Sequence, residues 1–135
     1  MLILFLYILR NGVSLMRIRK GTTPTLKLSL KKKNETDPEI DLSIADDIHV
    51  TFSRTHQQIL FDKTGEDLEI DGNDIYVFLS QKESLSLKGV GYGDNDSFLI
   101  QVNWTFTDAV TNRKKRACTV IKSINLDRNL INKEI

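Results

Sequence analysis

The sequence predicts an all-β fold: a single antiparallel β-sandwich of the immunoglobulin-like kind, with about seven strands and one short helical turn. Two observations carry this prediction. From residue 23 onward, apolar and polar residues alternate almost everywhere, which is the two-residue period of a half-buried strand. The alternating runs are short and regularly spaced between turn residues, and no stretch keeps a helical period over the length of a helix.

The expected strands follow one another along the chain with turn residues between them. They lie at residues 25–30, 48–53, 59–61, 68–70, 75–79, 97–106 and 116–124. The Asp71-Gly72 pair between two of these runs predicts a tight hairpin, because glycine accepts a positive φ without steric cost. Ser80 and Glu83 have the spacing of a capping box and predict the one helical turn.

The stretch 97–106, SFLIQVNWTF, has the longest clean alternation in the chain. Its apolar face is expected to fill the core and carries Phe98, Ile100, Val102, Trp104 and Phe106. The opposite face carries Gln101, Asn103 and Thr105, which are our first candidates for contact with a partner at a sheet face or edge.

Length and composition suit one domain that needs no metal or disulfide for stability. The chain has 135 residues, enough to bury a sizeable core. Its 19 basic and 18 acidic residues leave a formal charge of +1, which gives no general attraction to nucleic acid or to an anionic membrane. Cys118 is the only cysteine, so no intrachain disulfide can form, which favours a reducing compartment.

Residues 1–15 are set apart from the single domain expected at 16–135. The first nine residues are apolar, but Arg10 ends the run well short of the about 20 residues that a membrane-spanning helix needs. A signal peptide would have basic residues before this run and a cleavage site after it, and neither is present. The segment is interpreted as an extension from the choice of start codon, since Met16 opens like a natural beginning. A short membrane-associating segment and an extra apolar strand remain as alternatives.

No motif for catalysis, cofactor or metal stands out. His49, His56 and Cys118 have no ligand spacing, so no metal is expected. The serines lie in no G-x-S-x-G elbow, no carboxylate pair is marked for glycosidase chemistry, and GVGYG lacks the phosphate-loop pattern and the helix that should follow it. We therefore expect no enzyme, no cofactor and no small-molecule substrate. A convergent set of titratable groups in a cleft would revive the enzyme alternative.

The sharpest charge run lies in an expected hairpin loop and comprises Arg113, Lys114, Lys115 and Arg116. Such a run can contact phosphates or an acidic partner. No aromatic residues interleave with it for base stacking, and the rest of the chain cancels its charge, so binding of nucleic acid is disfavoured. These four residues join the candidate contact residues for a protein partner.

Several segments in succession carry a family resemblance: MRIRKGTTPTLKLSL, DLSIADDIHVTF, LEIDGNDIYVFLSQKESLSL, FLIQVNWTF, and a basic loop leading into ACTVIKSINLDRNLINKEI. This succession resembles small immunoglobulin-like virion proteins of tailed bacteriophages and of prophages of gut bacteria. It is also similar to the N-terminal domains of phage baseplate upper proteins. The resemblance covers about residues 16–135 and rests on strand and turn patterns.

The resemblance implies a non-enzymatic structural protein of a tail, baseplate or head–tail assembly, built into the virion in the cytoplasm of the host bacterium. Its partners would be other virion proteins or copies of itself. The long C-terminal extension of full baseplate proteins is not part of this chain, which argues against a receptor-binding role. The alternative is a bacterial envelope or cell-surface β-sandwich that binds a ligand or carbohydrate.

Overall fold

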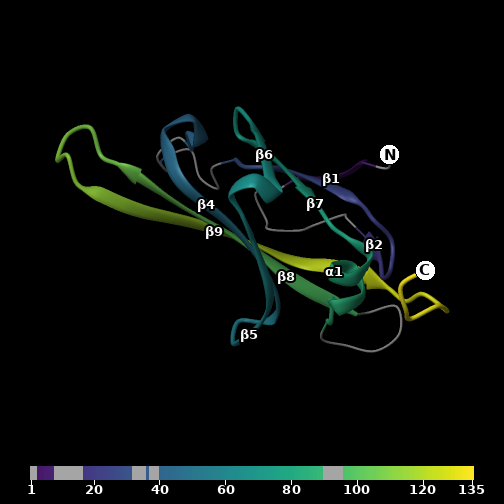
Figure 1. The fold of residues 1–135 in the computed structure, drawn as a ribbon. Coiled ribbons are helices and arrows are strands. Elements are labelled where there is room, and N and C mark those ends of the chain that lie inside the picture. Colours follow the sequence, from purple (N-terminus) through teal and green to yellow (C-terminus); the bar gives the residue numbers. More distant parts are fainter. Residues whose placement is uncertain (1–2, 8–16, 32–35, 37–39, 90–95) are drawn as a thin grey trace.

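The computed structural model describes residues 3–7, 17–31, 36, 40–89 and 96–135, which form two β-sheets packed face to face (Figure 1). The first sheet has the strand order β1-β3-β7-β6, with bounds Ile3–Tyr7, Thr25–Ser29, Asp74–Phe78 and Leu68–Asp71. The second has the order β2-β9-β8-β4-β5, with bounds Arg17–Arg19, Lys114–Asp127, Ser97–Thr107, Ala45–Thr55 and Gln58–Thr64. The predicted all-β sandwich is confirmed.

The strand order is that of an immunoglobulin-like sandwich. Strands β1, β3, β7 and β6 occupy the positions A, B, E and D of that fold, and β9, β8, β4 and β5 occupy G, F, C and C′. The helix α1, Gln81–Ser86, lies on the connection that crosses from the first sheet to the second. Two short 3₁₀ turns, η1 at Leu42–Ile44 and η2 at Gly65–Asp67, precede β4 and β6.

The described residues contain nine strands, against about seven expected, and the additional two lie near the N-terminus. Strand β2 pairs parallel with the end of β9, and β1 pairs parallel with β3, so the sandwich is not wholly antiparallel. A three-residue strand such as β2 is too short to show a period of two. Strand β1 falls within residues 1–15, where an extra strand was one alternative; where translation starts remains a prediction.

The core lies between the sheets and is built from the alternation that the sequence displays. Phe98, Ile100 and Val102 of β8 are fully buried, and Trp104 is 6% exposed, which confirms the apolar face of β8 as core. The Phe52 ring of β4 stacks on Phe61, with ring centroids 4.6 Å apart, and joins both strands to this core.

The hairpin turn and the capping box that the sequence predicts are both present in the structure. Gly72 has a φ of +61° in the turn between β6 and β7, where Asp71 pairs with Asp74. At the start of α1, the Glu83 backbone N–H donates to Ser80 Oγ and the Ser80 backbone N–H donates to Glu83 Oε1, which is the reciprocal capping box.

Candidate functional site

The outward face of the five-stranded sheet contains a shallow depression of about 330 Å³, and most of the residues that line it are polar. Four neighbouring strands supply its lining, because residues opposite each other in an antiparallel pair share a face. His49 of β4 lies opposite Asn103 of β8, and Thr105 of β8 lies opposite Arg116 of β9. The lining residues are Asp47, His49, Thr51, Asp62, Asn103, Trp104, Thr105 and Arg116.

One side of the depression is organised by the carboxylate of Asp62 on β5. Its Oδ2 lies 2.8 Å from His49 Nδ1, and its Oδ1 accepts a hydrogen bond of 2.8 Å from Thr51 Oγ1. The side chains of His49 and Asp62 are 48% and 41% exposed, so water reaches the pair. The outward strand positions of β4 and β5 therefore present a fixed acceptor and an imidazole side by side.

The other side is organised by Arg116 on β9. Its Nε and Nη2 both donate to Asn103 Oδ1, at 3.1 and 2.9 Å, which orients the guanidinium along the sheet. Thr105 Oγ1 donates to Asp47 Oδ2 at 3.3 Å, and Lys114 Nζ lies 3.5 Å from the same oxygen. The polar side chains are thus held in place by one another, which lowers the entropy lost when a partner covers them.

The groups that line the depression can donate and accept hydrogen bonds. A His–Asp pair supports nucleophilic catalysis when the histidine also contacts a serine, threonine or cysteine nucleophile. Within the described residues, the hydroxyl of Thr51 bonds to Asp62 and not to His49, and no other hydroxyl hydrogen-bonds to His49. The described residues also hold no cluster of three or more His, Cys, Asp or Glu side chains fit for a metal ion.

The structure brings some of the predicted contact residues together and separates others. Asn103, Thr105 and Arg116 line the depression, Gln101 lies on the same face opposite Thr51, and Lys114 reaches the depression through Asp47.

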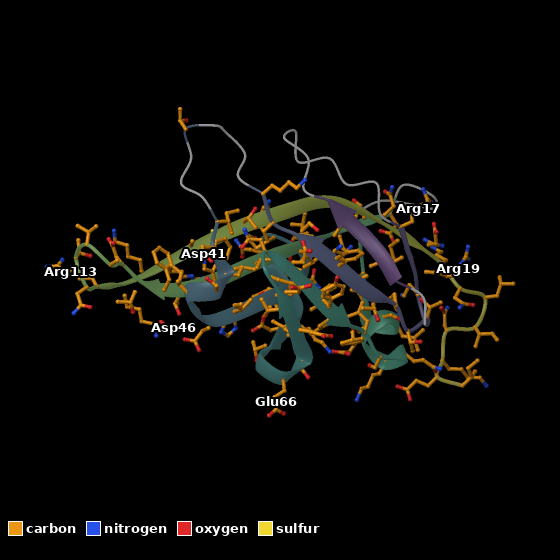
Figure 2. The ribbon with its side chains drawn as sticks, turned by 90° about the horizontal axis from the view of Figure 1, so that it is seen from above. Arg17, Arg19, Asp41, Asp46, Glu66 and Arg113 are labelled. Atoms are coloured by element: carbon orange, nitrogen blue, oxygen red, sulfur yellow. The ribbon has the colours of Figure 1, made fainter. Side chains whose placement is uncertain are left out.

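The other two predicted residues lie away from the depression. Lys115 binds Asp108 at 2.6 Å. Arg113 lies at the far tip of the β8–β9 hairpin (Figure 2), which extends beyond the sandwich in Figure 1.

Sequence reasoning missed the half of the site that β4 and β5 supply. The strand at 48–53 showed His49 and Thr51 on its polar side, which was the available signal. Nothing in the sequence indicated that this side would lie beside Asn103, because that neighbour is more than 50 residues away in the chain.

Comparison of the chain with known protein families, with curated proteins and with solved structures found no match. In the described part of the chain, no helix has the length and apolar character needed to span a bilayer.

Proposed function

We propose that this chain is a non-enzymatic structural protein of a tailed-bacteriophage virion, a component of the tail, baseplate or head–tail connection. It acts through protein–protein contacts and is assembled in the cytoplasm of the host bacterium. The observation that carries the proposal is the polar outward face of the five-stranded sheet, with the depression formed by β5, β4, β8 and β9. The sequence resemblance to virion proteins supports the choice of assembly.

The character of this face favours a protein partner. Its depression is open, and its polar groups are already bonded to one another, so a partner meets a preformed surface. Trp104 is among the lining residues, but it belongs to the buried core and is only 6% exposed, so it offers little surface for a sugar ring to stack on. Copies of itself and other virion proteins are both suitable partners for such a surface.

The first experiment is mass spectrometry of density-purified particles induced from the source strain. A structural protein is expected in the particles at stoichiometric abundance, and its abundance relative to other components indicates the substructure. Peptides from residues 1–15 would show that this segment is translated. Absence from the particles, with presence in the envelope, would refute the proposal.

A variant of Arg116 tests whether the polar face is the contact surface. Arg116→Lys keeps the positive charge but cannot make the two-donor contact with Asn103, so it should reduce incorporation into particles. Lys82→Arg is the matched control, because Lys82 is exposed on α1 and lies outside the depression. Equal incorporation of both variants would show that assembly uses another surface.

One observation supports the alternative of a bacterial envelope protein that binds a ligand or carbohydrate. A depression of about 330 Å³ lies at the lower end of the size range of small-ligand sites, and its lining carries both donors and acceptors. Binding to a glycan array that Arg116→Lys abolishes, together with export to the envelope, would favour this alternative.

A further inference from the structure

A second depression, of about 460 Å³, lies away from the polar sheet face and is surrounded by positive charge. Four segments that are distant in sequence contribute one cation each: Lys20 after β2, Arg54 in β4, Lys88 after α1 and Arg128 after β9. Among the described residues of its lining, Asp96 carries the one carboxylate. We call this feature the basic depression.

The backbone fixes these segments against one another. Lys20 N–H donates to Asp127 O at 2.9 Å, and Asn129 Nδ2 donates to Lys20 O at 3.0 Å. Arg54 Nε donates to Gly89 O at 3.0 Å, which holds its guanidinium at the rim. The position of the cations is therefore set by the fold, although their side chains end in solvent.

Within the part of the chain that the structure describes, the four cations outnumber the one carboxylate, Asp96, that lines the depression with them. None of them makes an ion pair there, although Arg17 and Lys63 do so elsewhere in the chain. A concentration of unpaired like charge raises the local potential and attracts an anionic group of matching extent.

A complementary set of carboxylates lies elsewhere on the same chain. Glu66, Asp67, Glu69 and Asp71 fall within six residues on η2 and the strand β6, all four are exposed, and none makes an ion pair within the described residues. Among the described strands, β6 is the outer strand of its sheet and pairs only with β7, so no described strand covers its other edge. We call this feature the acidic edge.

The two features do not meet within one molecule. Figure 2 shows Glu66 well apart from Arg19, the neighbour of Lys20. Four unpaired carboxylates and four unpaired cations on one chain of net charge +1 are complementary between copies, and the near-zero net charge leaves little repulsion between them. We propose that the acidic edge of one copy docks in the basic depression of another copy.

This inference goes beyond the proposed function, because it uses surfaces other than the polar sheet face and names the partner as a second copy of the chain. The contact joins two different patches, so it either closes into a symmetric oligomer or continues from copy to copy. It depends on charge, so salt should weaken it strongly.

Sedimentation velocity of the purified full chain tests the proposal. The chain should form a concentration-dependent larger species at 0.1 M salt, where charges act over about 10 Å, and lose it at 1 M, where they act over about 3 Å. Lys88→Glu/Arg128→Glu and Glu66→Lys/Glu69→Lys should each weaken association by about tenfold or more. Lys31→Glu/Lys82→Glu is the matched control, with the same change of charge on exposed lysines outside the basic depression, and should associate like the wild type.

Mixing the two reversed variants provides the decisive measurement. Each carries a surface that complements the other, so a mixture of equal amounts should recover the larger species that neither forms alone. Circular dichroism and thermal unfolding of each variant confirm that the fold is kept.

A wild type that stays monomeric, or variants that associate like the wild type, would overturn the inference. So would a mixture that stays monomeric. A protein found in virions but monomeric in isolation would refute this contact and leave the proposed function standing, so the two failures are distinguishable.

Discussion

The ion pair between Lys63 and Glu83 should stabilise the sandwich by an amount that can be worked out from its geometry. Lys63 Nζ lies 2.8 Å from both carboxylate oxygens of Glu83, so strand β5 is fastened to helix α1. The side chains are 10% and 27% exposed. Breaking a fully buried pair costs about 3 to 5 kcal/mol, and a hydrogen bond to a charged group contributes about 1.5 to 3 kcal/mol.

Three variants separate the contributions. Lys63→Met keeps the apolar stem and leaves a carboxylate that water partly reaches, so it should cost about 2 kcal/mol in free energy of unfolding. Glu83→Gln keeps a side chain that suits the capping box but leaves the more buried ammonium unpaired, so it should cost about 3 kcal/mol. The double variant should cost less than the sum, because neither charge is then left alone.

The measurement is urea unfolding followed by the fluorescence of Trp104, the one tryptophan, which is buried. For a chain of this size, about 2 kcal/mol corresponds to a fall in Tm of about 6 to 8 °C. A cost below about 0.5 kcal/mol for Lys63→Met, or strict additivity in the double variant, would refute the argument that this pair fastens α1 to the sheet.

The same pair gives a pH dependence. Partial burial is the largest single influence on the pKa of Glu83 and raises it, but hydrogen bonds from Lys63 and the Ser80 backbone, with the charge of Lys63, together hold the pKa below the ordinary 4.5. A carboxyl whose pKa is lower in the folded state than in the unfolded state stabilises the fold at a pH above its unfolded-state pKa. This stabilisation is lost as the pH falls through the folded-state pKa. The wild type should therefore lose part of its stability below pH 4.5 that Glu83→Gln does not lose.

Two further predictions concern backbone and hairpin. Gly89→Ala should lower the free energy of unfolding in urea by about 2 to 3 kcal/mol, because an added Cβ would lie 2.6 Å from the backbone nitrogen of the first residue of β8. Gly65→Ala is the comparison: Gly65 has a φ of +56° but open space around it, so this variant should cost about 1 kcal/mol. At the hairpin tip, the hydrogen bond from Lys115, aided by the Val110 N–H, lowers the pKa of Asp108 to about 2. The ionised carboxylate should order the hairpin tip fully above pH 3.8, and this order should be lost as the pH falls toward 2. In Asp108→Ala the tip should be disordered at every pH. Amide hydrogen exchange of Val110 measures both.

The sequence predicted the structure well where the physical cause is local. The alternation of β8, the turn at Gly72 and the capping box at Ser80 each involve residues within a few positions of one another. The parallel pairings of β1 and β2 escaped prediction because they join segments that are distant in the chain or too short to show a period.

The half of the polar face that β4 and β5 supply escaped prediction for a different reason, because it depends on which strands pair and in which register. A shift between Ala45 and Asp47 in the pairing of β4 with β8 places Asp47 opposite Thr105 while Ala45 lies opposite Phe106. Asp46 is the extra residue of this bulge, so β4 and β8 pair on both sides of it. The alternation in β4 places His49 on the outward side, but it does not say which residue of a neighbouring strand lies opposite His49.

The alternation of side chains along β9 also determines which partners the basic residues 113–116 contact. In the sequence, Arg113 to Arg116 form one block of positive charge, but β9 begins at Lys114, and successive strand residues face opposite ways. Lys114 and Arg116 therefore face the polar depression, where Asp47 and Asn103 bind them, while Lys115 binds Asp108. A phosphate backbone is attracted by cations that share one face and remain unpaired, and this strand divides its cations between two faces and partners three of them. The same division leaves Arg116 fixed in the depression by its two hydrogen bonds to Asn103.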